Sequence, residues 1–166
     1  MLKELYEQGY GFEKFMNADG GEHVDKVMNF LQLSEDAITE SVREKLMAID
    51  SAHVVVFGEV WCPDCMINVA VLEVMHNLNN NIKYSVVPRT GFEEQLKSLT
   101  PDHSAKIPTF VSVDANWEVK GVFLEKPQVV KDVEASDDQV KRIVIKRDYR
   151  NGKYVLDTME EIIGLL

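Results

Sequence analysis

The sequence predicts an α/β protein in which a central mixed sheet of about four strands is flanked by helices. Three features support this prediction. A strand, a helix and a second strand follow one another over residues 53–87, which is typical of a βαβ unit with parallel pairing and a right-handed crossover. A β-hairpin is expected over residues 106–124. Helical patterns occupy both ends of the chain, at residues 1–50 and 128–166.

The first 50 residues are expected to form a helical extension. Apolar residues recur at helical spacing on both sides of a glycine-containing break at residues 9–11. Ser34 is expected to cap a helix, because a serine oxygen accepts hydrogen bonds from the first N–H groups and Glu35 and Asp36 follow it. The apolar stripes of this region are more typical of a hydrophobic core than of a cofactor site.

The βαβ unit begins with an apolar strand at residues 54–57. This strand has no polar alternation, which is typical of a strand covered on both faces. A helix is expected over residues 66–78, and residues 82–87 form the second strand. The only two cysteines of the chain, Cys62 and Cys65, lie between the first strand and the helix.

The remaining elements follow in order. A turn leads to a short helix at residues 92–99 and then to the hairpin, which turns at residues 114–117. Residues 128–148 are expected to form a helix in two pieces, divided near Ser136, and a final helix is expected over residues 154–166. The residues expected to face inward from the divided helix are Val129, Val133, Val140, Ile143 and Val144.

The sequence contains no internal repeat, low-complexity tract or linker. A single domain over residues 1–166 is therefore expected, with a helical extension at residues 1–50 and a core at residues 51–166. A chain of 166 residues with 45% hydrophobic content is long enough for one hydrophobic core.

The formal net charge of −10 argues against two classes of partner. Nucleic acids and anionic membranes both need a basic protein surface, so neither is expected to bind. No apolar run approaches the length of about 18 residues that a membrane-spanning helix needs. The N-terminus has mixed charge and no signal-peptide pattern, so a cytoplasmic protein is expected. In a reducing compartment, two closely spaced cysteines indicate redox chemistry or a metal site rather than a structural disulfide.

The candidate chemistry lies in the segment Trp61-Cys62-Pro63-Asp64-Cys65. Two cysteines three positions apart at a helix start place both sulfurs on one face, close enough to form a disulfide. Unpaired N–H groups and the positive end of the helix favour the thiolate and lower its pKa. Cys62 is therefore expected to be the solvent-accessible nucleophile. Cys65, one turn further in, is expected to be the shielded thiol that resolves a mixed disulfide.

Pro63 and Asp64 are expected to tune the thiols. Pro63 suits the first helical position, where its missing N–H leaves no bond unmade. Asp64 is favourable at a helix start, but its charge raises the pKa of a nearby thiolate. Cys62 is therefore expected to be only moderately acidic, and the couple to be moderately reducing rather than strongly oxidising.

A zinc site is the alternative interpretation of a C-x-x-C pair. Zinc needs four ligands, the chain has no second C-x-x-C pair, and none of its four histidines pairs with another at ligand spacing. No metal site is therefore expected within one chain, and two pairs shared across a dimer are the remaining form of this alternative. His103, in the loop before Pro108, is the histidine to test for proximity to the sulfurs. No cofactor is implied.

The Trp-Cys-Pro-Asp-Cys segment after an apolar strand, with Ile107-Pro108-Thr109 at the start of a later strand, resembles the thioredoxin superfamily. The resemblance covers roughly residues 50–125 and implies a thioredoxin-like fold with a helical N-terminal extension. It gives the two cysteines the roles of attacking and resolving thiol. Trp61 matches the aromatic residue that shapes the substrate surface. Pro108 matches the family's cis-proline, with Ile107 presenting its backbone N–H and C=O to an extended substrate.

The chain departs from the family pattern at three points. Val56 occupies the position where many members have a buried aspartate that moves the proton of the resolving thiol. Glu59 and Asp64 are the two candidates to replace it, although an acid at a strand end, such as Glu59, is more typically solvated. Pro63-Asp64 replaces the usual glycine-proline pair, and the first strand of ordinary thioredoxin is not evident.

The leading functional interpretation is a thiol–disulfide oxidoreductase that acts on protein or small-molecule disulfides. Its electron donor would be a reductase or a low-molecular-weight thiol. Two other interpretations stay open at this point. One is a non-enzymatic binding or adaptor module on the same fold, since a fold does not determine a function. The other is a redox sensor that signals its oxidation state through the N-terminal helices.

Overall fold

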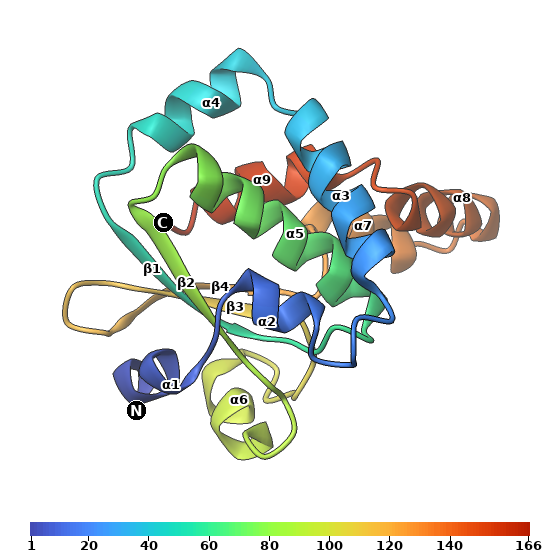
Figure 1. Cartoon of the computed structure of the whole chain (residues 1–166). Coiled ribbons are helices and arrows are strands. Elements are labelled where there is room, and N and C mark those ends of the chain that lie inside the picture. The colour runs from blue at the N-terminus through green and yellow to red at the C-terminus, as the bar shows by residue number, and fades with distance from the viewer.

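The computed structural model describes all 166 residues and contains one mixed sheet with helices on both sides (Figure 1). The strands are β1 (Ala52–Phe57), β2 (Ile82–Val87), β3 (Thr109–Val113) and β4 (Val119–Leu124). Their order in the sheet is β2-β1-β3-β4. β1 pairs in parallel with β2 and antiparallel with β3, and β3 pairs antiparallel with β4. The predicted α/β class and the mixed sheet of four strands are confirmed.

Helix α5 (Pro63–Leu78) connects the two parallel strands and lies at the centre of the molecule (Figure 1). Helices α3 (Val24–Asp36) and α9 (Val155–Ile163) pack against it. Residues 64–72 of α5 are all buried, because protein surrounds this part of the helix. A helix in such a setting is apolar on nearly every side. Its burial fixes the position of the first turn, where the cysteines lie.

The residues of the expected helical extension form α1 (Leu2–Gln8), α2 (Phe12–Met16), α3 and α4 (Glu40–Met47). The predicted cap at Ser34 is wrong, because α3 continues through this residue. The buried Ser34 hydroxyl donates to the Phe30 carbonyl at 2.7 Å, a bond that satisfies a serine inside a helix. Thr39 caps α4 instead, and its hydroxyl accepts from the Val42 N–H at 3.2 Å.

Residues 9–11 join the sheet as well as separating two helices. Tyr10 forms an antiparallel bridge with Val86 at the outer edge of β2. The Tyr10 N–H donates to the Val86 carbonyl at 2.9 Å, and the Val86 N–H donates to the Tyr10 carbonyl at 2.8 Å. Gly9 lies so close to β2 that a Cβ there would overlap the Ser85 hydroxyl and lie 2.7 Å from the Val86 carbonyl oxygen. This contact anchors the N-terminal helices to the sheet.

The later helices are α6 (Glu93–Leu99), α7 (Gln128–Glu134) and α8 (Gln139–Arg150). The division predicted near Ser136 is confirmed, but the predicted inward face is wrong. Four of its residues are exposed, namely Val129, Val140, Ile143 and Val144. Ile145 and Tyr149 are buried instead, because the Tyr149 hydroxyl accepts a hydrogen bond from Asn68 of α5 at 2.9 Å. None of the helices has both the length and the hydropathy that crossing a membrane requires.

Candidate active site

The chain leaves β1 and enters α5 at the two cysteines. Cys62 is the N-cap residue of α5, and Pro63 occupies the first turn, as expected. Proline suits this place because its φ is preset and it has no N–H to leave unpaired. The Cys62 N–H donates to the Glu59 carbonyl at 3.1 Å, and the Cys62 carbonyl accepts from the Met66 N–H at 3.0 Å. The backbone around the first cysteine is therefore held on both sides.

The two sulfurs differ in exposure, and both are free thiols. Cys62 keeps 8% of its surface exposed, whereas Cys65 is completely buried. Cys62 is therefore less exposed than its predicted role suggested. It is still the only one of the two thiols that an incoming disulfide reaches without a rearrangement of the protein.

The thiols also differ in pKa. The pKa of Cys62 is lowered to about 7, chiefly because the Cys65 thiol donates a hydrogen bond to its sulfur. Burial and the Asp64 charge raise it, while N–H groups at the helix start lower it. The helix start therefore lowers the pKa of Cys62 as expected, but the hydrogen bond from Cys65 lowers it more. The pKa of Cys65 is raised well above its ordinary value, first by burial and then by its bond to Cys62.

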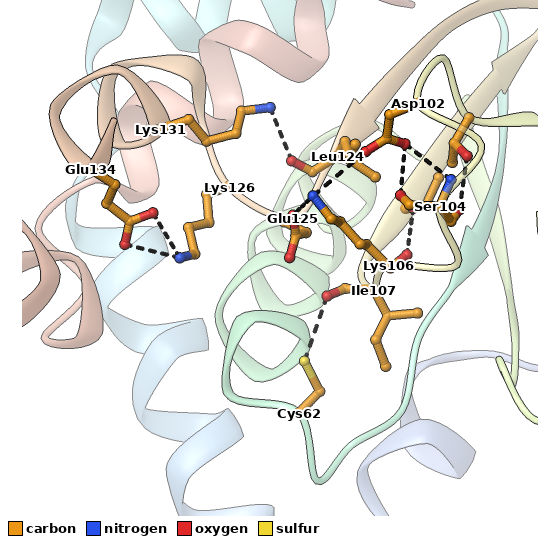
Figure 2. Close-up of polar contacts among 12 residues, drawn as sticks. Cys62, Asp102, Ser104, Lys106, Ile107, Leu124, Glu125, Lys126, Lys131 and Glu134 are labelled. Carbon is orange, nitrogen blue, oxygen red and sulfur yellow. Dashed lines mark hydrogen bonds and ion pairs between the residues drawn. The ribbon is translucent and has the colours of Figure 1, made fainter. Parts of the chain in front are cut away.

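The loop that contains Lys106, Ile107 and Pro108, here called the proline loop, lies opposite Cys62 (Figure 2). The Ile107–Pro108 peptide bond is cis, as the resemblance implied. The Cys62 thiol donates to the Ile107 carbonyl at 3.7 Å. The Glu125 N–H donates to the Pro108 carbonyl at 2.8 Å, and the Lys106 ammonium lies 3.3 Å from the Glu125 carboxylate. These contacts hold the loop so that its backbone faces the sulfur.

Trp61 is 51% exposed, and the Arg89 guanidinium lies 5.5 Å from the centre of its ring. Ile107 and Pro108 are buried, so they offer backbone groups rather than side-chain surface. The structure thus places an exposed aromatic ring next in sequence to Cys62 and a backbone carbonyl in contact with its thiol. The role of Trp61, Ile107 and Pro108 in substrate binding stays a prediction.

The two candidate acids lie in different surroundings. Glu59 is half-buried, and its carboxylate accepts from the Thr90 N–H at 3.2 Å. Asp64 is buried, and its Oδ1 has no hydrogen-bond partner and lies 3.8 Å from the Arg150 guanidinium. Burial raises the pKa of Asp64, and the charges of Lys126 and Arg150 partly offset this rise. Asp64 is therefore the buried carboxyl group beside the thiols.

Asn68 was not among the predicted site residues, yet it joins the cysteine helix to three other elements. Its Nδ2 lies 2.9 Å from the Asp64 carbonyl, the Glu125 carbonyl and the Tyr149 hydroxyl. Its Oδ1 accepts from the Thr158 hydroxyl at 3.1 Å. The sequence signal was an asparagine within an otherwise apolar run. A completely buried amide needs partners, and here they come from the regions that surround the thiols.

Neither cysteine belongs to a group of potential metal ligands. One group of His, Cys, Asp or Glu side chains is close enough to share an ion, and it consists of Asp19, Glu22 and His23. His103 is exposed, and its Nδ1 lies 3.3 Å from the Lys97 carbonyl. Two thiols with no third ligand in the chain suit thiol–disulfide exchange better than they suit zinc.

Comparison with known proteins agrees with this geometry. A family model described as thioredoxin matches residues 9–141. The chain belongs to the thioredoxin family. Two solved structures each have a TM-score of 0.85 and 25% identity, covering 98% of this chain and 95% of the other. One is a protein of unknown function from Pseudomonas aeruginosa, and the other is an HIV epitope scaffold. No curated protein matches the sequence. The thioredoxin-like fold that the two motifs implied is thereby confirmed.

Proposed function

We propose that this member of the thioredoxin family is a thiol–disulfide oxidoreductase that alternates between a Cys62–Cys65 dithiol and disulfide. The supporting observation is that two thiols one turn apart have pKa values shifted in opposite directions. A partly ionised Cys62 can attack a disulfide at neutral pH. A protonated Cys65 does not compete with it and is held ready for the second step.

The reaction has two steps. The Cys62 thiolate attacks one sulfur of the substrate disulfide, forming a mixed disulfide, and the other substrate sulfur leaves as a thiolate that takes a proton from water. Cys65 then loses its proton and attacks the Cys62 sulfur, so that the second substrate sulfur leaves as a thiol. The protein gives up two electrons and becomes a disulfide, and the substrate is reduced to two thiols.

We assign to Asp64 the task of accepting the Cys65 proton. Its charge acts on both thiols, and one of its oxygens has no hydrogen-bond partner. Burial raises the pKa of this carboxyl group and so makes the carboxylate a better proton acceptor. Glu59 is less suited, because its carboxylate already accepts from the Thr90 N–H.

The substrate would be a protein or small-molecule disulfide bound between the Trp61 ring and the proline loop. In the resting dithiol, the Ile107 carbonyl accepts from the Cys62 thiol. Ionisation of Cys62 removes that proton and leaves the carbonyl available to an N–H group of an extended substrate. A reductase or a low-molecular-weight thiol would return the two electrons, and a reducing cytoplasm would favour this direction.

The reduction of insulin disulfides by dithiothreitol, followed by turbidity, tests the proposal. The wild-type protein is expected to accelerate the reaction. Cys62→Ser is expected to lose about 10³-fold of that activity or more, because a serine hydroxyl is not ionised at neutral pH. Cys65→Ser is the matched control, and it is expected to trap a mixed disulfide that mass spectrometry detects. Equal rates for the wild type and Cys62→Ser would favour a binding or adaptor module instead.

A further inference from the structure

A cavity of about 520 Å³ lies beside the cysteines, between α3 and the first turns of α5. Its apolar wall includes Phe30 from α3 and Pro63 and Met66 from α5. Two of these residues are next to the nucleophile, since Pro63 follows Cys62 in the chain and the Met66 N–H donates to the Cys62 carbonyl. The volume falls within the range of small-molecule sites, about 300–1,000 Å³.

The polar edge of this cavity is cationic, although the whole chain carries a net charge of −10. Lys26 and Arg150 line it, and Asp25 is the one carboxylate among the lining residues. Lys26 has no ion-pair partner within the chain. Arg150 lies 3.8 Å from the Asp64 carboxylate, and about half of the Arg150 side chain is exposed. Lys26 is therefore available to an anionic group beside the dithiol, and Arg150 adds a positive charge that it shares with Asp64.

We infer that this cavity binds one arm of a low-molecular-weight disulfide whose arms carry carboxylates. The inference rests on the proposed function and names a substrate class for it. An arm of two or three residues, about 10 Å when extended, matches a cavity of this size. Lys26 and Arg150 would bind its carboxylates through charge-assisted hydrogen bonds. The aliphatic part of the arm would lie against Phe30, Pro63 and Met66.

The cavity favours a small molecule over a protein surface because it is bounded by two packed helices and by the end of α8.

The electron balance is that of the proposed reaction. Cys62 attacks the sulfur of the bound arm, the free arm leaves as a thiolate that takes a proton, and Cys65 then releases the bound arm as a thiol. Two electrons pass from the dithiol to the substrate.

The test compares two disulfides in single turnovers. The reduced protein is mixed with glutathione disulfide, whose arms carry carboxylates, or with the neutral bis(2-hydroxyethyl) disulfide. The remaining thiols are then quenched, alkylated and counted by mass spectrometry. Lys26→Glu is expected to lower the rate constant for glutathione disulfide about tenfold, because reversing a charge beside an anion turns attraction into repulsion. The rate for the neutral disulfide is expected to stay within about twofold.

Lys45→Glu provides the matched control. Lys45 is an exposed lysine of α4, and α4 contacts the opposite end of α5 through the bond from Asn79 to the Leu46 carbonyl. This variant is expected to change neither rate. The effect of Lys26→Glu is expected to shrink at high salt, where exposed charges are screened.

The outcomes separate this inference from the function on which it rests. An unchanged rate with glutathione disulfide in Lys26→Glu would overturn the inference, and so would an equal fall with both disulfides. A wild-type protein that accelerates insulin reduction but reacts with neither small disulfide would overturn the inference alone. Failure in the insulin assay as well would overturn the oxidoreductase function itself.

Discussion

Cys62 and Cys65 lie one turn apart at the start of the same helix, yet their environments assign them opposite properties. Cys62 retains some exposure and has a lowered pKa, whereas Cys65 is completely buried and has a raised pKa. Both are near the same helix N-terminus, so the helix start alone does not separate them. The difference comes from burial and from the direction of one hydrogen bond, which Cys65 donates and Cys62 accepts.

Removal of the Cys65 thiol, which donates the hydrogen bond to Cys62, is expected to have the largest effect on the difference between the two cysteines. Cys65→Ala is expected to abolish turnover, a loss of about 10³-fold or more, because no second thiol resolves the mixed disulfide. It is also expected to raise the pKa of Cys62 from about 7 toward the value of a free cysteine, about 8.5. Alkylation by iodoacetamide as a function of pH measures this shift. Cys65→Ser keeps a hydroxyl donor and is expected to shift the pKa less, so equal shifts would contradict the assigned hydrogen bond.

Asn68 joins the cysteine helix α5 to the segment at Glu125, to α8 and to α9. Asn68→Ala is expected to lower the free energy of unfolding by about 2–3 kcal/mol, because it leaves the buried Thr158 hydroxyl without its acceptor and removes the side-chain donor to the Asp64 and Glu125 carbonyls. Urea denaturation measures the change. Asn116→Ala is the matched control at an exposed turn position and is expected to change stability by less than about 0.5 kcal/mol. Similar losses of unfolding free energy in both variants would show that the hydrogen bonds of Asn68 do not stabilise the protein more than an exposed asparagine does.

The pH dependence of the reaction separates the two thiols directly. The thiolate is the reactive form, and the pKa of Cys62 is lowered to about 7. The alkylation rate of Cys62 is therefore expected to rise about tenfold between about pH 6 and about pH 8 and then to level off. Cys65, whose pKa is raised, is expected to stay unmodified over this range. Modification of both thiols with one midpoint would remove the distinction between them.

Asp64 supplies the smallest of the expected effects on the nucleophile. Its charge raises the pKa of both thiols, so Asp64→Asn is expected to lower the pKa of Cys62 by about 0.5–1 unit. The variant is also expected to slow the release of the substrate from the mixed disulfide, because the proton acceptor is lost. Glu59→Gln is the control, since Glu59 is not among the groups that shift Cys62. A faster release step in Asp64→Asn would exclude the proton-acceptor role.

Local sequence patterns were enough to place the cysteines on the strand-to-helix turn and to place the strands. Periodicity did not determine which face of α8 is buried, because Ile143, Val144 and Ile145 are consecutive apolar residues and each favours a different face. The bond from Asn68 to Tyr149 decides between these faces, and it joins residues far apart in the chain. The burial of Asp64 depends in the same way on distant elements. The sequence therefore did not decide whether Asp64 or Glu59 replaces the buried aspartate of the family.

The bridge between Tyr10 and Val86 has a consequence beyond the anchoring of α1 and α2. The outer edge of β2 is otherwise a row of main-chain groups to which a strand of another molecule can add. Gly9 permits the covering segment to lie there, because any larger residue would collide with the Ser85 hydroxyl and the Val86 carbonyl. Substitution at this one glycine would uncover the edge, and the protein would be expected to aggregate while its thiols remained chemically intact.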